Sequence, residues 1–248
     1  KTIIAGEKPN KSKINTTKPA EVNGKPTGKV ILYGSEGESI KARSVNQLEM
    51  VNSIDDFDML FAIGPAGTGK TYTSVALAVN ALKNKEVKRI ILTRPAVEAG
   101  ENLGFLPGDL KDKLDPYLQP LYDALRDMVP AERLANYMEK GIIQIAPLAF
   151  MRGRTLDHAF VILDEAQNAT KSQLKMFLTR MGRSAKFIIT GDMTQVDLPK
   201  NQPSGLVHAT TILKGVPEIK FIFLDERDII RHNLVKKIIA QYDKNESK

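Results

Sequence analysis

The stretch from residue 64 to residue 71 has the residue types and spacing needed to bind a nucleoside triphosphate. Its sequence is GPAGTGKT, which matches the phosphate-loop pattern G-x-x-x-x-G-K-[ST]. Glycines let consecutive backbone N–H groups turn toward phosphate oxygens, and a helix that begins there directs its positive dipole end at them. In this pattern Lys70 bridges the β- and γ-phosphates, and the Thr71 hydroxyl binds Mg²⁺. We therefore predict that ATP and Mg²⁺ are bound here. The predicted binding residues are Gly64, Pro65, Ala66, Gly67, Thr68, Gly69, Lys70, Thr71 and Tyr72.

The residues on either side of this loop favour a phosphate loop over an ordinary glycine-rich turn. Residues 59–63 form a continuous apolar run that suits a buried strand. Residues 70–82 repeat apolar side chains at helical spacing. Strand, glycine loop and helix therefore follow one another in the order that the motif requires.

A pair of acids, Asp164 and Glu165, forms the second predicted site. They follow the apolar run 160–163, and carboxylates at the end of a buried strand are costly unless a cation compensates them. Asp164 is predicted to hold Mg²⁺ through water, and Glu165 to polarise the attacking water. Two solvated acids that open a loop are the alternative, and the phosphate loop upstream makes us prefer catalysis.

Two further strands end in polar residues that belong to the same prediction. The runs 89–93 and 186–190 are both apolar, and in an open parallel sheet ligands bind at the carboxyl ends of the strands. Gln195 follows the second run and is placed to sense the γ-phosphate. Gln167 is a second candidate for that role.

Gln47 lies shortly upstream of the phosphate loop, on a predicted helix that Ser44 caps. A side-chain amide can both donate to and accept from an adenine edge. A solvated glutamine on the helix surface is the other interpretation, and the residues alone do not decide between them.

The remaining pattern predicts an α/β domain of three layers with a mainly parallel sheet. A hairpin is predicted near the N-terminus, and residues 96–116 lack periodicity, as expected of a long functional loop. The other predicted strands are 142–146 and 220–224, and the other predicted helices are 116–128, 130–140, 171–181, 205–213 and 229–242.

Composition limits the class of protein. A chain of 248 residues, 42% of them hydrophobic, can bury one good core. It has no cysteine, which excludes disulfides and thiolate zinc ligands and fits a reducing cytoplasm. There is no apolar run of membrane-spanning length and no signal peptide, so we expect a soluble, cytoplasmic protein. The chain begins with Lys1 rather than Met, and we expect it to be a fragment.

The net charge of +7 is concentrated in residues 1–29, where seven lysines and two glutamates give +5. We predict that this stretch is a basic flexible tail or linker and that residues 30–248 form the domain. The tail could contact a phosphate backbone, but the chain has no tryptophan and few aromatic residues on which bases could stack.

Five segments together resemble the PhoH family, whose members are ATPases related to the first motor domain of superfamily 1 helicases. The segments are GPAGTGKT (64–71), LTRPAVEAGENLGFLPGDL (92–110), FVILDEAQN (160–168), TGDMTQVDLP (190–199) and RDIIRH (227–232). The resemblance extends from Val30 to the end of the chain and implies a RecA-like P-loop NTPase fold. It also implies Gln47 near adenine, Asp164 on Mg²⁺ and Gln195 on the γ-phosphate. The family is associated with RNA metabolism and phosphate starvation, which makes single-stranded RNA the expected partner.

A helicase motor has a second domain that supplies an arginine to the γ-phosphate, and only one domain fits here. The arginine must then come from this domain or from another subunit. Arg180, Arg227 and Arg231 are the candidates, and Arg231 lies in a family segment. We therefore expect a homo-oligomeric ring, with hexamers suggested by relatives.

These inferences predict a Mg²⁺-dependent ATPase that acts on RNA as a helicase-like motor or remodelling factor. Its catalytic residues would be Lys70, Glu165, Gln195 and Arg231. An ATP-gated binding switch with little turnover is the alternative, and a small-molecule kinase is a further one.

Overall fold

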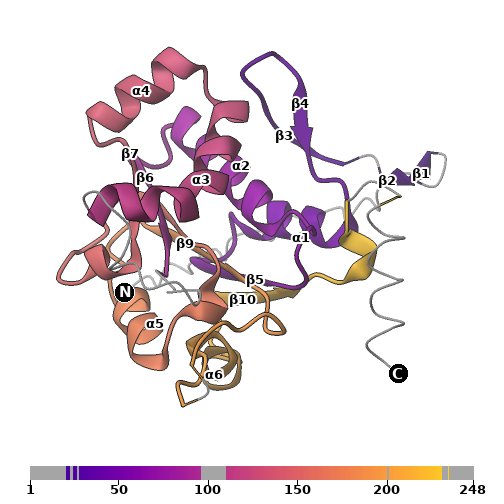
Figure 1. Cartoon of the computed structure of the whole chain (residues 1–248). Helices are drawn as coiled ribbons and strands as arrows, with labels where there is room; N and C mark the ends of the chain where they lie inside the picture. Colours follow the sequence, from indigo (N-terminus) through magenta and orange to yellow (C-terminus); the bar gives the residue numbers. More distant parts are fainter. Residues whose placement is uncertain are drawn as a thin grey trace, which may run out of the picture.

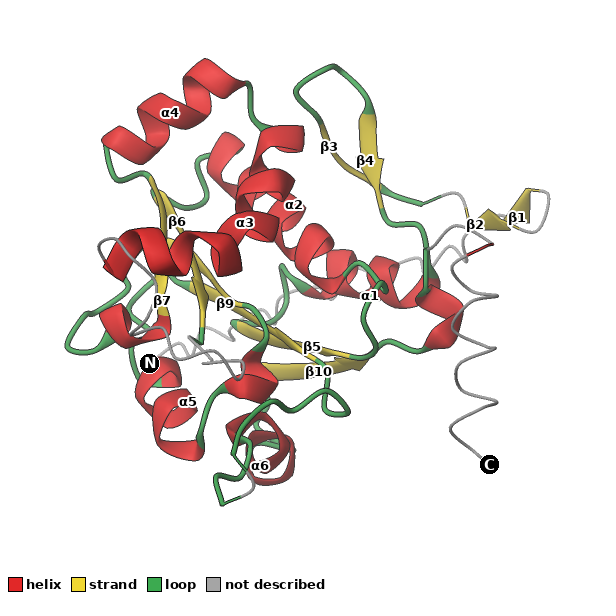
Figure 2. Ribbon diagram, in the orientation of Figure 1, coloured by secondary structure: helices red, strands yellow, loops and turns green. Residues whose placement is uncertain are grey.

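A parallel sheet of six strands forms the centre of the computed structural model (Figure 1, Figure 2). The structure describes residues 21–22, 25–26, 28–95, 110–199, 201–230 and 234. The strand order is β10-β5-β9-β8-β6-β7, and each neighbouring pair is parallel. The strands are β5 (Met59–Ile63), β6 (Arg89–Arg94), β7 (Ile143–Pro147), β8 (Ala159–Leu163), β9 (Lys186–Gly191) and β10 (Ile219–Phe223).

Helices cover both faces of this sheet, as the sequence predicted. Helices α1 to α4 and the hairpin lie on one face, and α5 and α6 lie on the other (Figure 1). The helices are α1 (Val45–Ser53), α2 (Lys70–Lys83), α3 (Leu110–Met128), α4 (Ala131–Glu139), α5 (Lys171–Leu178) and α6 (Gly205–Ile212). The prediction of a three-layer α/β domain with a RecA-like parallel sheet is therefore confirmed.

Alternation along the strands divides the core into two clusters. In β5, Leu60 and Ala62 pack in the cluster beneath α2 and α3, whereas Phe61 and Ile63 pack in the cluster beneath α5 and α6. All five residues of β5 are buried, and so are all five of β8. Strands that are covered on both faces appear in sequence as continuous apolar runs, which explains why both were found from sequence.

The carboxyl ends of the strands form one edge, where backbone hydrogen bonds link successive chain segments. The N–H of Leu224 donates to the Ile63 carbonyl (2.7 Å), and the N–H of Gly64 donates to the Gly191 carbonyl (3.0 Å). Strand β9 separates the strand of the phosphate loop from β8, which carries the acidic pair at its end. The loops after β5, β6, β8 and β9 therefore lie along the same edge.

Two antiparallel pairs of strands precede the sheet. The pair β3 (Val30–Tyr33) and β4 (Ser39–Lys41) is the predicted hairpin, and β1 (Glu21–Val22) pairs with β2 (Lys25–Pro26). The turn between β3 and β4 is held to the end of α3, because the Ser35 N–H donates to the Asp127 carbonyl (2.7 Å). This hairpin closes one side of a cavity near the phosphate loop.

The start of α3 was predicted wrongly. Pro116 was expected at the first turn of this helix, but the helix begins at Leu110 and contains Pro116 and Pro120. Proline inside a helix removes a hydrogen bond, but Leu121 and Leu125 are fully buried and their packing holds the helix in place.

The predicted terminal helix 229–242 lies outside the described residues except at 229, 230 and 234, and residues 229 and 230 are not helical. Segment 96–109 and most of the basic tail also lie outside the described ranges. Within those ranges, each helix is too short or too polar to cross a lipid bilayer.

Candidate nucleotide site

The phosphate loop connects β5 to α2, and glycine is required at two of its positions. Gly69 precedes α2 with a φ of 77°, a conformation that L side chains rarely adopt. A Cβ atom at Gly64 would lie 2.3 Å from the carbonyl oxygen of Leu224. The loop backbone therefore approaches its neighbours more closely than other residues allow.

Lys70 lies inside the curve of this loop. Its Nζ donates to the carbonyls of Gly64 (2.6 Å) and Pro65 (2.8 Å), and the residue is 9% exposed. The ammonium group is therefore positioned by the loop itself, at the place where the motif puts phosphate oxygens.

Asp164 is the centre of a buried hydrogen-bond network. The hydroxyls of Thr71 (2.6 Å) and Thr190 donate to its Oδ1, and Arg94 donates to its Oδ2 from Nε (2.7 Å) and from Nη2. The residue is only 1% exposed. A buried carboxylate is costly without a partner, and Arg94 supplies the compensating charge.

The backbone of Glu165 is left-handed, with a φ of 55°. Such a conformation is uncommon for residues other than glycine and is concentrated at functional sites. Its side chain is 45% exposed, lies 3.8 Å from Arg94 Nη2, and accepts a hydrogen bond from Gln167 Nε2 (2.6 Å). The two acids therefore have different surroundings: one is buried and charge-paired, the other half-exposed.

The two glutamines proposed to sense the γ-phosphate differ in position. Gln167 is 1% exposed, and while its Nε2 donates to Glu165, its Oε1 accepts from the Asp192 N–H (3.0 Å). Gln195 is exposed on the loop after β9, and its side chain does not line the cavity described next. Gln167 therefore supports Glu165, and the role of Gln195 stays a prediction.

A cavity of about 430 Å³ brings most of these groups together. We call it the phosphate cavity. Its lining includes Lys70, Thr71, Arg94, Asp164, Glu165 and Gly191.

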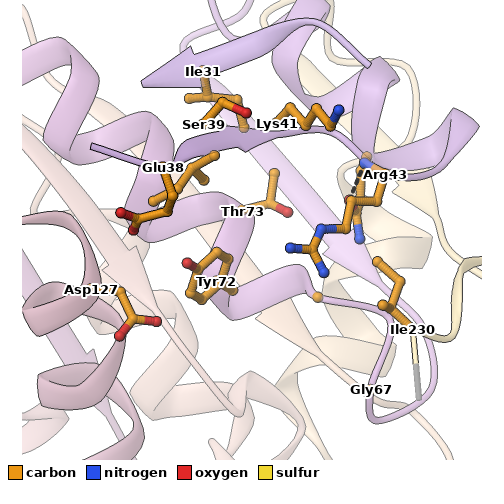
Figure 3. A pocket seen from close by; sticks show the side chains of 13 residues that line it. Ile31, Glu38, Ser39, Lys41, Arg43, Gly67, Tyr72, Thr73, Asp127 and Ile230 are labelled. Atoms are coloured by element: carbon orange, nitrogen blue, oxygen red, sulfur yellow. Dashed lines mark hydrogen bonds between the residues drawn. The ribbon is translucent and has the colours of Figure 1, made fainter. Parts of the chain in front are cut away.

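A second cavity of about 350 Å³ adjoins it and shares Gly67, Gly69, Tyr72 and Asp127. We call this one the hairpin cavity. Figure 3 shows that it lies between the β3–β4 hairpin, the first turn of α2 and the end of α3. Burial and the neighbouring Asp127 carboxylate raise the pKa of the Tyr72 hydroxyl above its ordinary value. A partly apolar recess beside a phosphate loop has the size and character to take a planar ring.

Gln47 lines the hairpin cavity but is bonded to the protein. Its Nε2 donates to the Thr68 carbonyl and its Oε1 accepts from the Arg43 N–H, both at 2.8 Å. It is 3% exposed, so the interpretation as a solvated surface residue is wrong. The amide braces the phosphate loop, and its predicted contact with adenine is untested.

The candidate arginines are not at the phosphate cavity in the part of the chain that the structure describes. Arg180 donates to the Met176 carbonyl beside α5, and Arg227 is paired with Asp225 in an exposed turn. Arg231 lies outside the described residues. Among the described arginines, Arg94 lines the phosphate cavity, and it is not one of the three candidates named from the sequence. Its position at the carboxyl end of a predicted strand was the feature of the sequence that could have identified it.

The residues present fit a magnesium ion that is bound together with phosphates. Within the described ranges there is no group of three or more His, Cys, Asp or Glu residues that could hold a metal. Mg²⁺ at phosphoryl-transfer sites uses one or two carboxylates together with substrate phosphates and water. The Thr71 hydroxyl beside Asp164, both lining one cavity, is such a donor set.

The phosphate loop, the Thr71–Asp164 pair and the strand order define a P-loop domain of the ATPase class. The family model described as "PhoH-like protein" matches residues 39–243, and the chain belongs to the PhoH family.

Curated relatives agree with this assignment. The chain is 60% identical over 214 residues to the PhoH-like protein of Bacillus subtilis (strain 168), covering 86% of this chain and 67% of that protein. It is 43% identical over 205 residues to the protein PhoH of Escherichia coli (strain K12), covering 82% and 58%. The chain thus spans about three fifths to two thirds of the length of these relatives.

The solved structures that the chain resembles include a helicase and a terminase. The Pif1 helicase from Candida albicans has a TM-score of 0.42 and 16% identity, covering 79% of this chain and 42% of that one. The large terminase from a thermophilic bacteriophage has a TM-score of 0.45 and 17% identity, covering 79% and 49%. The fold assignment rests on the strand order and not on these scores.

Proposed function

We propose that this chain is a Mg²⁺-dependent ATPase that releases the γ-phosphate by in-line attack of water. The observation that carries the proposal is the convergence of Lys70, Thr71, Asp164 and Glu165 on one cavity beside the phosphate loop. A small-molecule kinase would not need an acid that polarises water beside the metal carboxylate, because its acceptor takes the place of the attacking water.

Each residue has a distinct part in this proposal. The loop N–H groups and Lys70 would bind the phosphates, and Thr71 and Asp164 would hold Mg²⁺. The metal, when bound, neutralises charge on the β- and γ-phosphates. Glu165 accepts a proton from the attacking water, whose oxygen bonds to the γ-phosphorus. The bond to the bridging oxygen breaks, and ADP and phosphate leave.

Gln167 would orient Glu165, because its amide connects that carboxylate to the Asp192 N–H at the end of β9. The hairpin cavity would take the nucleobase, with the Tyr72 ring along one wall (Figure 3). Gln195 would reach the γ-phosphate after movement of its loop.

Steady-state phosphate release from ATP tests the proposal. Glu165→Gln removes the base with little change in shape, and we expect the rate to fall by about 10²–10⁴-fold. Glu139→Gln, an exposed acid on α4, is the matched control and should leave the rate unchanged. Equal rates for Glu165→Gln and the unaltered chain would refute Glu165 as the base.

The same assay separates the alternative functions. If the protein is an ATP-gated switch, both the unaltered chain and Glu165→Gln should bind nucleotide tightly and release almost no phosphate. A kinase would consume ATP only after an acceptor is added. Lys70→Ala should weaken nucleotide binding under all three functions, so it checks the site and not the reaction.

We extend the proposal to RNA and to assembly. Single-stranded RNA is the proposed partner, a homo-oligomeric ring of the hexameric kind is the proposed state, and the cytoplasm is the proposed location. The basic tail, with its charge of +5, supports a contact with a phosphate backbone. RNA should raise the rate of phosphate release. If light scattering with ATP finds only monomers at full activity, Arg231 does not act from a neighbouring subunit.

A further inference from the structure

The carboxylate proposed to hold the metal already has protein partners on both oxygens. Oδ1 accepts from the hydroxyls of Thr71 and Thr190, and Oδ2 accepts from two nitrogens of Arg94. Asp164 is 1% exposed, so no bulk water screens this pair. Charge-assisted hydrogen bonds of this kind are about twice as strong as neutral ones.

Arg94 is held in this position from two sides. It ends β6, which pairs with β8, and the Asp164 N–H donates to the carbonyl of the preceding residue, Thr93 (2.9 Å). Its Nη1 donates to the Tyr117 carbonyl in α3 (2.7 Å), and its side chain is 14% exposed. The guanidinium is therefore built into the wall of the phosphate cavity and does not point into solvent.

Mg²⁺ needs the negative charge of the Asp164 carboxylate whether it binds directly or through water, and Arg94 already neutralises that charge. Two cations at short range in a site with little water repel each other strongly. The hydroxyl of Thr71 is different: it gives its proton to Oδ1 and keeps its oxygen lone pairs for a metal. The conflict at the metal site is therefore specific to Arg94.

We propose that Arg94 is an exchangeable counter-ion of Asp164, which competes with Mg²⁺ for that carboxylate. The metal then binds poorly alone and well together with a triphosphate, whose negative charge accepts both cations. This inference rests on the proposed function in one respect, that the metal carboxylate is Asp164. It makes Arg94 a positioning residue that prevents the metal from binding before the nucleotide.

The guanidinium released by this exchange stays in the phosphate cavity. Arg94 lines that cavity, is bonded to Tyr117 and lies 3.8 Å from Glu165, so a rotation of its side chain away from Asp164 would bring it toward bound phosphates. An arginine of this chain would then contribute positive charge near the transferred phosphate, in a cavity that the described candidates Arg180 and Arg227 do not line.

The test measures binding of MgCl₂ alone, by calorimetry at constant ionic strength, to the whole chain. We expect Arg94→Gln to bind Mg²⁺ at least tenfold more tightly than the unaltered chain, and Arg94→Lys to fall between them. Arg89→Gln is the matched control, since Arg89 lies at the other end of β6 and donates to the Asp157 carbonyl. A double variant, Arg94→Gln with Asp164→Asn, should lose the increased affinity for Mg²⁺. Equal Mg²⁺ affinities for Arg94→Gln and the unaltered chain would overturn the proposal.

Thermal unfolding gives an independent readout. Without metal, Arg94→Gln should melt below the unaltered chain, and MgCl₂ should raise its midpoint more than that of the unaltered chain. If Arg94→Gln does not fold, Arg94→Lys takes its place, and an equal effect of MgCl₂ on it and on the unaltered chain counts against the proposal.

Binding of a fluorescent ATP analogue, measured in parallel, separates the two levels of inference. If the chain does not bind the ATP analogue but Arg94→Gln still binds Mg²⁺ more tightly than the unaltered chain, the proposed ATPase function fails and the counter-ion role of Arg94 is supported. If the chain binds the analogue but Arg94→Gln and the unaltered chain bind Mg²⁺ equally, the counter-ion role fails and the nucleotide site is supported.

Discussion

Replacing Gln47 by alanine separates two roles of a buried amide. In the structure this side chain braces the phosphate loop through Thr68 and also holds the Arg43 N–H. The resemblance to motor ATPases instead places it on adenine. The brace would act on any nucleotide, whereas an adenine contact would act only on ATP.

The cost of Gln47→Ala follows from the two groups that lose their partner. The Thr68 carbonyl belongs to a fully buried residue, and an unsatisfied buried acceptor costs about 1–3 kcal/mol. The Arg43 N–H is partly exposed and can bind water, so its loss is nearer about 1 kcal/mol. We expect a loss of about 2–4 kcal/mol in the free energy of unfolding, which lowers the melting midpoint by roughly 4–15 °C.

The assay combines urea unfolding with the affinities for ATP and GTP. The matched control is Gln119→Ala, whose amide bonds an exposed aspartate one turn along α3, and it should change stability by less than about 0.5 kcal/mol. Gln47→Ala should lower the affinities for ATP and for GTP by a similar factor. Unchanged stability together with a loss confined to ATP would refute the brace and restore the adenine contact.

Three further predictions concern residues in and around the nucleotide site. Gly191→Ala places a Cβ atom 2.5 Å from Leu206 Cδ2 and 2.9 Å from Gln167 Oε1, and we expect a cost of about 1–3 kcal/mol of stability. Displacement of the Gln167 amide, which we propose orients Glu165, should also slow phosphate release, and a normal rate of release would contradict this. Thr190→Val keeps the shape but removes a donor to Asp164, and urea unfolding should detect a loss of about 1–3 kcal/mol. The raised pKa of Tyr72 means that its contribution to stability is fully present below its unfolded-state value of 10.0 and is lost as the pH rises through the folded-state value. Tyr72→Phe should abolish this alkaline step in a series of unfolding curves.

The strands were predictable because each is a short apolar run between polar residues. Strand β8 was placed at 160–163 and runs from Ala159 to Leu163. The start of helix α3 was not predictable in the same way, since two prolines inside the helix resemble a start signal. The buried Leu121 and Leu125 stabilise the helix in spite of these prolines. The local sequence pattern therefore located the helices and strands but not the start of α3.

The residues of the candidate site likewise fall into those that a local motif identifies and those that only the folded structure brings together. The phosphate loop and the acidic pair are contiguous motifs, so sequence alone located them. The Arg94–Asp164 pair joins residues 70 positions apart and exists because β6 and β8 are neighbours in the sheet. The Gln47 brace likewise depends on α1 lying beside the loop. Contacts of this kind require the strand order, which no local pattern contains.

The segment after β10 has a further consequence for the phosphate loop. It passes beside the loop, and the Ile230 N–H donates to the Gly67 carbonyl (3.1 Å) while Asp228 accepts from Asn46 in α1 (2.7 Å). If a nucleotide in the loop changes the strength of this contact, then by thermodynamic linkage whatever holds the chain beyond residue 230 changes nucleotide affinity by the same factor. A pulling force on that part of the chain, or the binding of a partner there, would then strengthen or weaken the binding of the triphosphate to the phosphate loop.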